Sequence, residues 1–583
     1  MARTPLFSSL RRLYRNALAS APAAAGSQAP EDAKTRLQTR RAILQASASM
    51  AAAALPAAAL SGCGDDESTP TPGEEKIVIV GGGIAGIHCA YRLKEADIIA
   101  TIYEAQDRVG GRMFSALGAF SEAPDQLCEL GGELIDSGHA TLHALADELG
   151  LELDDRTEGA KRDVYYIDGV DIPESVLVDQ FTEVAPVIAA QVAAADDEND
   201  DTAYVMFDEM NITDWCDQYV PVAMYPELNA VLKVAYRNEY GLENEEQSSL
   251  NLIYLIGSDD PDPFRLFGVS DERYHTHLGN DSFPTMLAAT LDPAQIKLEH
   301  SLKSVKDAGG GFDLVFDGPD GEVTVNATRV VFALPFTKLR EVDLSGLTLS
   351  EEKRNIIDTL GYGTNAKVMI GFSSRVWNVT HDTSGGMVTD LGVQQSWDTT
   401  IGQDGAHGII TNFLGGQTGT DSGAGEATDW AEAVVPDLET IWPGMQAAYT
   451  GEAVRMHWPT VPTMKGSYAC YKPGQWSFFG LEGEREGNLH FCGEHTSLDF
   501  QGYMEGGAET GGFVAAEIIE DNDMAQPQGM INALGVKLLV PQAGYRAKVY
   551  GNLNAFQRRR VARQVYAELA AKVQGIGAAP AAP

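Results

Sequence analysis

Lys76-Ile77-Val78-Ile79-Val80-Gly81-Gly82-Gly83-Ile84-Ala85-Gly86 is the stretch that decides the fold of this chain. A run of β-branched residues leads directly into a Gly-x-Gly-x-x-Gly turn, and apolar residues at helical spacing follow it. This order predicts a strand, a tight turn and a helix. Gly81 permits the turn, Gly83 lets the backbone approach a pyrophosphate, and Gly86 lets the helix pack closely on the strand.

An acid follows this unit at the spacing that a dinucleotide site requires. Residues 98–103 are a second β-rich stretch, and Glu104 ends it, eighteen residues after Gly86. An acid at this point can accept hydrogen bonds from the ribose hydroxyls of adenosine. The helix that begins at Ile84 and Ala85 presents unpaired N–H groups and a positive dipole end to phosphates. We interpret the region as a dinucleotide site; a glycine turn in an ordinary α/β unit is the alternative.

Residues 104–112 indicate which dinucleotide binds. They read Glu-Ala-Gln-Asp-Arg-Val-Gly-Gly-Arg and closely resemble the E-A-x-x-R-x-G-G-R stretch of the flavin amine oxidase family, which includes monoamine, polyamine and L-amino-acid oxidases and tryptophan monooxygenases. The resemblance implies FAD rather than NAD. Gly110 and Gly111 allow close approach of the backbone, and Arg108 and Arg112 can donate charge-assisted hydrogen bonds to phosphate or flavin oxygens. Two surface arginines beside a flexible turn are the alternative.

The resemblance extends over roughly residues 76–520, with the motifs in the family's order. Residues 128–136 are similar to the D/E-L-G-G segment beside the flavin, and residues 491–511 are similar to the G-E-H/T-T and G-Y-M-E-G-A blocks. In the family, the position of Leu302 donates backbone hydrogen bonds to adenine. The residues predicted to contact FAD are Gly81, Gly83, Ile84, Ala85, Gly86, Glu104, Ala105, Arg108, Gly110, Gly111, Arg112, Gly131, Gly132, Glu133, Leu302, Trp458, Gly493, Glu494, Gly502, Tyr503 and Met504.

Two of these contacts and one substitution describe the expected flavin environment. Glu494 can accept hydrogen bonds from hydroxyls on the ribityl or phosphate side. The helix that opens around Met504 directs its dipole end toward the flavin O2/N1 region. Ser467 falls where monoamine oxidases carry the cysteine that is bonded to the flavin. Because serine cannot form that thioether, we predict noncovalent FAD.

Three residues are predicted to act in catalysis. Tyr468 and Tyr503 match the two aromatic residues that, in the family, stand face to face before the flavin and guide the amine. Lys367 matches a lysine that is hydrogen-bonded through a water to flavin N5. The resemblance implies hydride transfer from the amine α-carbon to N5, release of imine and ammonia, and reoxidation by O₂ to give hydrogen peroxide. Ordinary core aromatics and an edge-strand lysine reaching solvent are the alternatives.

The implied fold is a two-domain α/β flavoprotein with a discontinuous Rossmann-like FAD domain and a substrate domain of mixed sheet and helices. The predicted FAD-binding segments are 76–145, 271–345 and 483–522; the substrate domain takes helices from 146–270 and a sheet from 346–482, and a helical extension spans 523–583. The individual elements predicted are a helix at 141–149 ended by Gly150, strands at 296–302, 312–316, 323–325, 329–334 and 365–372, and a basic amphipathic helix at 553–573.

Residues 1–62 form a predicted export signal. They carry a net charge of +6, and Arg40-Arg41 with the alanine-rich apolar segment behind it resembles a twin-arginine signal. The tetrad 60–63 resembles a lipobox, which implies a lipid anchor at Cys63, and residues 63–75 read as a solvated tether. We therefore expect an exported periplasmic or cell-envelope lipoprotein that folds around FAD before export. An alanine-rich leader with a chance arginine pair is the alternative.

Length, charge and cysteine usage bound the remaining choices. A chain of 583 residues predicts more than one domain. A net charge of −41 argues against nucleic acid or anionic membrane as a partner, so membrane contact is expected only through Cys63. The other cysteines are odd in number with no C-x-x-C pair, which predicts neither a disulfide framework nor a metal site; Cys89, Cys128 and Cys492 are expected to be buried. The oligomeric state is left open, and a homodimer is compatible with the sequence.

The substrate is predicted to be an amine or an L-amino acid, with a small preference for the amino acid. Vertebrate-type L-amino-acid oxidases clamp the substrate carboxylate with an arginine, and the matching position here is Leu134. Arg273 could supply that clamp, or Glu133 or Asp136 could recruit a second ammonium. A related flavin desaturase or dehydrogenase, and a non-catalytic FAD-binding lipoprotein, are the alternatives. The tyrosine pair and Lys367 argue against the first, and the full set of flavin contacts argues against the second.

Overall fold

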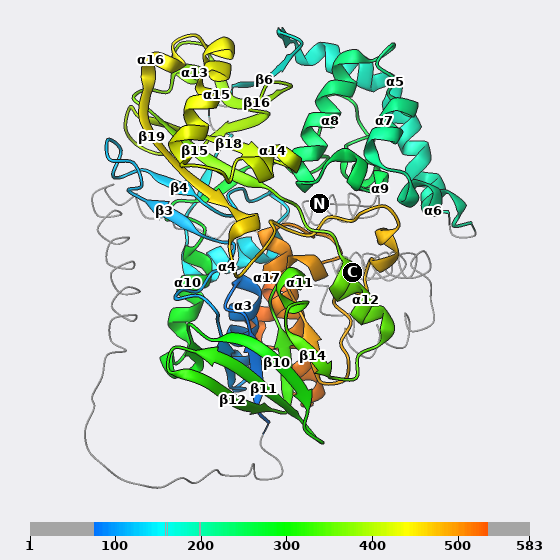
Figure 1. The fold of residues 1–583 in the computed structure, drawn as a ribbon, viewed down its shortest axis with the longest axis vertical. Helices are drawn as coiled ribbons and strands as arrows, with labels where there is room; N and C mark the ends of the chain where they lie inside the picture. The colour runs from blue at the N-terminus through cyan, green and yellow to red at the C-terminus, as the bar shows by residue number, and fades with distance from the viewer. Residues whose placement is uncertain (1–74, 158, 160, 198–199, 535–583) are drawn as a thin grey trace, which may run out of the picture.

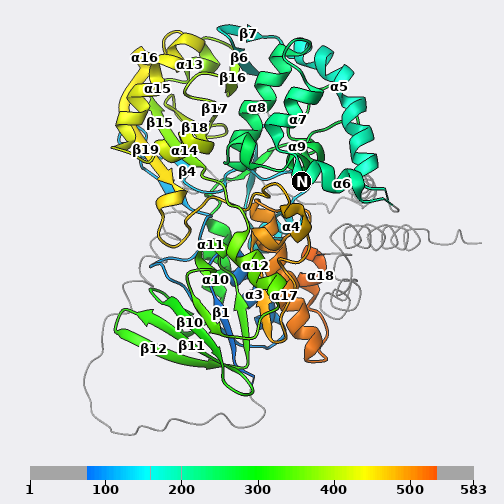
Figure 2. The ribbon, with the colours of Figure 1, turned by 45° about the vertical axis from the view of Figure 1, so that its right-hand side comes forward.

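The computed structural model describes residues 75–534, apart from residues 158, 160, 198 and 199 (Figure 1). Figures 1 and 2 show two lobes, one built on a parallel sheet and the other on a larger sheet with a group of helices beside it. The predicted export signal, Cys63, the tether before residue 75 and the helix predicted at 553–573 lie outside the described residues.

A five-stranded parallel sheet forms the centre of the first lobe. β1 (Ile77–Val80) lies between β13 and β2, with β20 and β9 at the edges. All of β1 is buried, and the glycine turn leads directly into α3 (Ile84–Glu95), which confirms the predicted strand, turn and helix. The other strands come from distant parts of the chain: β2 (Ala100–Tyr103), β9 (Ile296–Lys297), β13 (Arg329–Phe332) and β20 (Leu489–Phe491).

One long buried helix near the end of the described residues packs against the helix that follows β1. α17 (Met504–Asp521) packs along α3, as Figures 1 and 2 show. A Cβ on Gly511 would lie 2.1 Å from the carbonyl oxygen of Ala85, so only glycine lets the two helices come this close. Around this pair pack α4 (Ala140–Leu149), which ends at a left-handed Gly150 as predicted, α10 (Ser282–Thr290) and α18 (Gln528–Leu534).

A four-stranded sheet lies beside the parallel sheet in the same lobe, in the order β12-β11-β10-β14. The single strand predicted at 296–302 is wrong, because the chain turns between β9 and β10 and Glu299 has a positive φ of 58°. The other predicted strands of this region are confirmed and extended. The sheet consists of β10 (Ser301–Asp307), β11 (Phe312–Gly318), β12 (Gly321–Ala327) and β14 (Asp343–Gly346).

The second lobe is built on a seven-stranded sheet in the order β19-β15-β18-β17-β16-β6-β7. β15 (Ala366–Phe372) is buried along its whole length and pairs with a strand on each side. The strand that carries Lys367 is therefore an interior strand and not an edge. The rest of the sheet consists of β6 (Arg162–Ile167), β7 (Val170–Ile172), β16 (Thr383–Thr389), β17 (Gln395–Asp398), β18 (Gly408–Leu414) and β19 (Tyr449–His457).

The prediction that residues 146–270 supply helices to the substrate domain is wrong for residues 153–172, which contain three short strands. β6 and β7 form a hairpin through Asp168 and Gly169, whose φ angles are 51° and 78°. Asp-Gly favours such a two-residue turn, so the signal for this hairpin is present in the sequence. β5 (Leu153–Asp155) pairs with β8 (Tyr274–Thr276). The helices follow, beside the large sheet in Figure 2: α5 (Glu174–Ala195), α6 (Thr202–Glu209), α7 (Ile212–Tyr219), α8 (Pro226–Tyr240) and α9 (Ser249–Leu255).

Among the described helices, α5 alone has a length and composition that would allow it to cross a membrane. Leu177, Phe181 and Ile188 on this helix are buried in the hydrophobic core of the second lobe. Core helices of globular proteins pass the same test of length and composition, so this is weak evidence for a membrane span.

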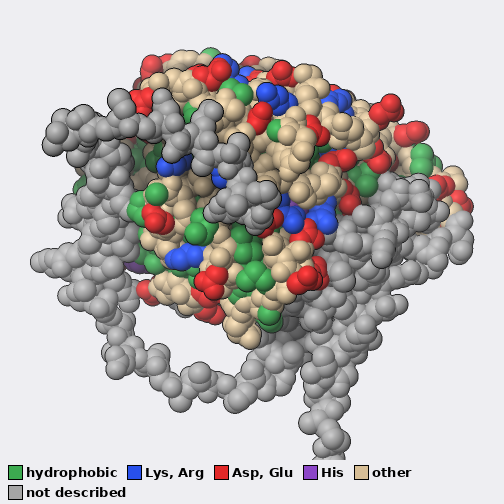
Figure 3. All heavy atoms as spheres, turned by 90° about the horizontal axis from the view of Figure 1, so that it is seen from below, with side chains coloured by type: hydrophobic (Ala, Val, Ile, Leu, Met, Phe, Trp, Pro, Cys, Tyr) green, Lys and Arg blue, Asp and Glu red, His purple; other side chains and the backbone are tan. Residues whose placement is uncertain are grey.

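The cysteines and the surface charge agree with a globular protein. Cys89, Cys128 and Cys492 are buried, as predicted, and every cysteine within residues 75–534 is a free thiol. No cluster of His, Cys, Asp or Glu side chains in this part of the chain could hold a metal ion. Figure 3 shows acidic and basic side chains interspersed on the face seen from below, without a continuous basic surface among the described atoms.

Candidate active site

A cavity of about 730 Å³ lies between the two lobes. The carboxyl ends of β1 and β2 line one end of it, and β15 with the last turn of α8 lines the other. Segments far apart in the sequence therefore converge on one space. The predicted site residues that line it are Gly81, Gly83, Ile84, Ala85, Glu104, Ala105, Gly110, Gly111, Arg112, Gly131, Gly132, Glu133, Leu302, Lys367, Trp458, Tyr468, Gly493, Glu494, Gly502, Tyr503 and Met504.

At the β1 end, Glu104 is tied to the glycine turn. Its carboxylate accepts hydrogen bonds from the backbone N–H of Gly82 (2.6 Å) and of Gln106 (2.8 Å). Burial raises the pKa of Glu104, and these hydrogen bonds together with the charge of Arg108 offset only part of that effect. The acid predicted to meet a ribose therefore also fixes the turn that would meet the phosphates.

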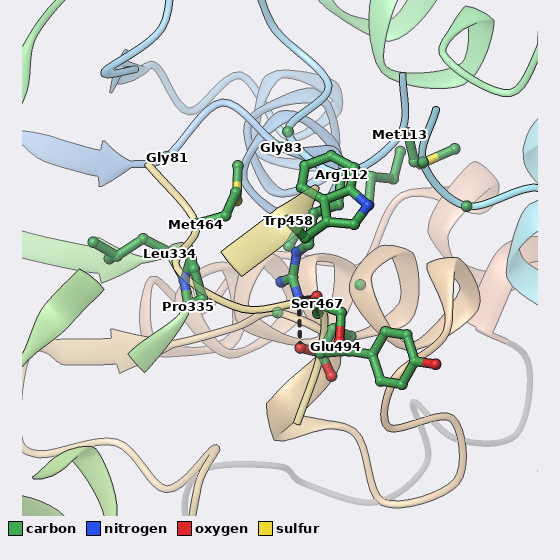
Figure 4. A pocket seen from close by; sticks show the side chains of 18 of the residues that line it. Gly81, Gly83, Arg112, Met113, Leu334, Pro335, Trp458, Met464, Ser467 and Glu494 are labelled. Carbon is green, nitrogen blue, oxygen red and sulfur yellow. Dashed lines mark hydrogen bonds and ion pairs between the residues drawn. The ribbon is translucent and has the colours of Figure 1, made fainter. Parts of the chain in front are cut away.

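Arg112 and Glu494 form an ion pair in the middle of the cavity wall (Figure 4). Arg112 Nη1 lies 2.8 Å from Glu494 Oε1 and donates a second hydrogen bond to the carbonyl of Ser467 at 2.7 Å. The other oxygen of Glu494 accepts from the N–H of Gly502 at 2.8 Å. The pair thus joins three separate segments that line the cavity, and Glu494, predicted to meet cofactor hydroxyls, already has protein partners.

Two of the predicted contact residues, Gly86 and Arg108, do not line the cavity. A Cβ on Gly86 would lie 2.1 Å from the carbonyl oxygen of Gly81, so Gly86 serves the close packing of α3 on the turn. The guanidinium of Arg108 donates to the carbonyl oxygens of Val109 and Gly111, and it lies 3.8 Å from the ring centroid of Phe114. Neither residue contacts the cavity directly in this structure, and both support the backbone of segments that line it.

Lys367 is buried in β15, and its ammonium contacts the segment that follows β4 (Leu127–Glu129). Lys367 Nζ lies 2.7 Å from Glu133 Oε2 and 3.0 Å from the carbonyl oxygen of Gly131. Burial alone would raise the pKa of Glu133, but attraction to Lys367 and Arg156 outweighs it and the pKa is lowered. Trp397 covers the ammonium, with its ring centroid 5.4 Å away. Glu133 is therefore held as a carboxylate beside Lys367 inside the cavity wall.

The two predicted cage tyrosines are both bonded to one residue, Glu239, at the end of α8. The hydroxyl of Tyr468 donates to the backbone carbonyl of Glu239, and the hydroxyl of Tyr503 donates to its carboxylate at 3.3 Å. Burial, followed by the charge of Glu239, raises the pKa of both tyrosines. They are therefore neutral hydrogen-bond donors, and their rings line the cavity. His139 packs edge-on against the ring of Tyr503 at 5.5 Å.

The shape and the lining of the cavity fit a dinucleotide with a flavin. Gly83 faces open space, since a Cβ there would lie 4.0 Å from its nearest neighbour, the Cα of Gly111. The N-terminus of α17 opens at Met504, whose N-cap residue Tyr503 makes no side-chain hydrogen bond to the helix. A helix N-terminus with unpaired N–H groups suits an anionic or electron-rich group. The volume lies within the range typical of ligand sites.

Several lining residues escape prediction from the sequence. Glu239 and Glu272 line the cavity, but no motif marks either of them. Leu134 lines it as well, and the structure places no arginine at that point. Arg273 lies outside the lining and is paired with Asp155, so it does not supply a carboxylate clamp in this structure.

Asp136, the other candidate for recruiting a second ammonium, does not line the cavity either. Its carboxylate accepts from the hydroxyl of Ser270 and the N–H of Glu272, and it faces His139.

The chain is similar to several flavin enzymes of known name. It is 24% identical to an L-amino-acid oxidase of Siganus canaliculatus over 72% of this chain and 81% of the relative, and 22% identical to a pseudooxynicotine dehydrogenase of Pseudomonas sp over 76% and 85%. The solved structure of cyclohexylamine oxidase from Brevibacterium oxydans IH-35A superposes with a TM-score of 0.66 at 21% identity, covering 77% of this chain and 99% of that chain. At such identities the structural likeness establishes the fold alone.

The family is established by a broader match. The model of the flavin containing amine oxidoreductases matches residues 84–214 and 223–519, a span that includes β2 at one end of the cavity and α8 and β15 at the other. The fold, the glycine turn and the match to this model agree, and a flavin cofactor follows from the family. This chain belongs to the flavin containing amine oxidoreductases.

Proposed function

We propose that this protein is an FAD-dependent oxidase of amines or L-amino acids. The observation that carries the proposal is the cavity itself, which joins the glycine turn of β1 to the Lys367–Glu133 pair and to the two tyrosines. FAD, when bound, would supply the hydride acceptor and return to its oxidised form with O₂, giving hydrogen peroxide. Imine hydrolysis would then release ammonia with an aldehyde or a keto acid.

The residues of the chain would act by binding and orientation. Tyr468 and Tyr503, fixed by Glu239, would hold the amine in an apolar slot that excludes water. Lys367, which is paired with Glu133, would stabilise the negative charge that develops during reoxidation. Arg112 and Glu494 would fix the wall against which the flavin lies. A hydride transfer from a neutral amine needs no strong general base among these residues.

The charge of the cavity favours an amine over an amino acid, which differs from the small preference drawn from the sequence. The cations that line the cavity each have an acidic partner: Arg112 with Glu494, Lys303 with Glu322, Lys338 with Glu341, and Lys367 with Glu133. A substrate carboxylate is bound best by a cation that can offer two hydrogen bonds. Within the described lining, such a group would first have to leave its present partner.

Noncovalent binding of FAD is part of the proposal. Ser467 lines the cavity, is buried, and donates its hydroxyl to Asn365 Oδ1 at 2.6 Å. A serine at this position offers no thiol for a thioether. Denaturation with acid should therefore release all the flavin into the supernatant, and flavin that stays with the precipitated protein would contradict noncovalent binding.

Export also belongs to the proposal, on the basis of the leader sequence alone. A twin-arginine signal at Arg40-Arg41 with lipidation at Cys63 would deliver a folded flavoprotein to the cell envelope. Replacing both arginines by lysine should leave the protein in the cytoplasm, and Cys63→Ser should release it from the membrane fraction. Unchanged fractionation of both variants would contradict this part. Association into a homodimer is tested separately by light scattering.

The decisive experiment is anaerobic stopped-flow reduction of the flavin with a panel of L-amino acids, monoamines and polyamines. Loss of the flavin absorption band with any of these, followed by peroxide on admission of O₂, would support the oxidase. Loss of the band with amino acids alone would shift the assignment to an L-amino-acid oxidase. A flavin that none of them reduces would contradict the proposal and would favour a desaturase or dehydrogenase acting on a non-amine substrate.

A further inference from the structure

His139 is fully buried and is absent from the described lining of the cavity, but its ring packs against that of Tyr503, which does line it. The two ring centroids lie 5.5 Å apart, and the ring planes meet at 70°. Phe500 meets the imidazole in the same edge-on manner at 5.3 Å. Edge-on packing is a preferred arrangement of aromatic rings. His139 therefore supports a ring of the cavity wall without entering the cavity itself.

Asp136 fixes the orientation of this imidazole. The backbone N–H of Asp136 donates to His139 Nδ1 at 3.0 Å, so the ring proton lies on Nε2. His139 Nε2 lies 3.3 Å from Asp136 Oδ2. The carboxylate is itself held in place, because its other oxygen accepts hydrogen bonds from the hydroxyl of Ser270 and the N–H of Glu272, both at 2.9 Å. The imidazole is therefore held in one orientation relative to Tyr503.

Glu505 fixes the position of His139 along the chain. His139 is the N-cap residue of α4, and its own side chain makes no capping hydrogen bond to that helix. The buried carboxylate of Glu505 accepts the N–H groups of Thr141 at 2.7 Å and Leu142 at 2.9 Å instead. A carboxylate is stabilised at a helix N-terminus by such charge-assisted bonds. Because Glu505 follows Tyr503 by two residues in α17, the contacts form a closed loop that leads from Tyr503 through α4 and His139 back to the ring of Tyr503.

We propose that His139 is a positioning residue: held by Asp136 and Glu505, it fixes the ring of Tyr503 in the orientation that places the amine for oxidation. The inference rests on the proposed function. The hydroxyl of Tyr503 is bonded to Glu239, but that bond restrains only one end of the side chain, and the contact with His139 restrains the ring. A small displacement of a group that orients the substrate lowers the rate strongly. Because Tyr503 would orient the amine, its displacement should lower the limiting rate more than the affinity.

The test measures anaerobic flavin reduction in the FAD-loaded protein, with whichever of pentylamine, 1,5-diaminopentane and L-leucine reduces the wild-type flavin fastest. In His139→Ala the limiting rate should fall by about tenfold or more, while the apparent Kd stays within about threefold. His139→Phe keeps an aromatic ring against Tyr503 and should restore the limiting rate to within about threefold of wild type. Glu505→Gln should also lower the limiting rate. Adding it to His139→Ala should cause no further loss, since Glu505 acts through His139.

Fluorine NMR of protein labelled with fluorotyrosine follows the ring of Tyr503 without any substrate, and Tyr503→Phe assigns its resonance. The resonance should shift in His139→Ala and in Glu505→Gln, which provides the same test should His139→Ala fail to fold. Glu426→Gln is the matched control, because Glu426 caps α15 (Ala427–Ile441) at an exposed position outside the described cavity lining, and it should change neither the rate nor the resonance.

A limiting rate or a Tyr503 resonance that stays at its wild-type value in these variants would overturn this inference, and so would rate losses that add in the double variant. A wild-type flavin that no amine or amino acid reduces would instead contradict the proposed function. The Tyr503 resonance would then still decide whether His139 holds that ring in place.

Discussion

The ammonium of Lys367 lies 2.7 Å from the carboxylate of Glu133, and both side chains are almost completely buried. The lysine belongs to an interior strand of the seven-stranded sheet, while the glutamate follows β4, at the glycines that line the cavity. Burying either charge alone would be very unfavourable, so each residue offsets part of the free-energy cost of burying the other. The pair therefore links the segment that follows β4 to the seven-stranded sheet across the cavity.

The first prediction concerns the stability of this pair. Lys367→Met should lower the free energy of unfolding by about 3 kcal/mol, since it leaves the buried carboxylate of Glu133 with Arg156, 3.9 Å away, as its remaining ion-pair partner. Adding Glu133→Gln to that variant removes the buried negative charge and should restore part of the loss. Denaturant unfolding of the single and double variants measures this. A double variant no more stable than Lys367→Met would show that the two residues are not coupled.

The second prediction concerns reoxidation. In Lys367→Met/Glu133→Gln, flavin reduced by substrate should react with O₂ at least about tenfold more slowly, because no ammonium remains to stabilise developing negative charge. Reduction of the flavin by substrate under anaerobic conditions should change far less. Stopped-flow absorbance follows both half-reactions separately. A double variant that reoxidises at the wild-type rate would remove Lys367 from this role.

The third prediction separates two glycines of the turn. Gly83→Ala places a methyl group in the open cavity, so the fold should persist while the affinity for FAD drops by about tenfold or more. Gly86→Ala places a methyl group 2.1 Å from the carbonyl oxygen of Gly81, so it should destabilise the protein itself by about 1–3 kcal/mol or more. Flavin titration and denaturant unfolding of both apoproteins distinguish these outcomes. Equal losses of stability would contradict the assignment of Gly83 to the cofactor.

The fourth prediction tests the wall formed by Arg112. Arg112→Ala removes the bonds to Glu494 and to the Ser467 carbonyl and leaves a carboxylate in the cavity wall. Flavin content after gel filtration should fall sharply, and the dissociation rate of FAD should rise by about tenfold or more. Arg485→Ala, which breaks a more exposed pair with Asp521, should change neither measurement. Retention of full flavin content by Arg112→Ala would show that the pair is only structural.

Local patterns predict most of the cofactor end of the cavity but little of the substrate end. The glycine turn, Glu104 and the stretch around Glu494 can be predicted because short-range geometry dictates those residue types. Lys367 is recognisable as a costly charge in an apolar strand, although its partner Glu133 depends on tertiary packing. No local sequence pattern identifies Glu239 as a cavity residue. Its partners there are two tyrosines that lie more than 200 residues further along the chain.

The strands between residues 153 and 172 escape prediction from the sequence for a different reason. The Asp168-Gly169 hairpin signal is present in the sequence, but β6 pairs with β16, more than 200 residues away, as well as with β7. Short strands of mixed polarity acquire their conformation from such pairing. The break between β9 and β10 also depends on tertiary structure, because the two strands belong to different sheets. The left-handed backbone at Glu299 turns the chain from one sheet to the other.

The last prediction concerns the pH dependence of stability through Glu272. Its pKa is raised to about 8 in the folded protein, by burial and then by repulsion from Asp136 and Glu239, against an ordinary value of 4.5. Between these two values the folded state retains a proton that the unfolded state has lost, so this residue makes the protein less stable as the pH rises through that window. Because more than a third of Glu272 is exposed to solvent, water screens these interactions and we expect an effect of only about 1 kcal/mol.

Glu272→Gln cannot lose a proton, so its melting temperature should rise relative to wild type between pH 6 and pH 9 and differ least at the acidic end. Differential scanning fluorimetry of the FAD-loaded proteins measures this. Glu209→Gln, at the exposed end of α6, serves as the control and should show the same pH profile as wild type. If the difference between Glu272→Gln and wild type is constant with pH, Glu272 is not held protonated by its acidic neighbours.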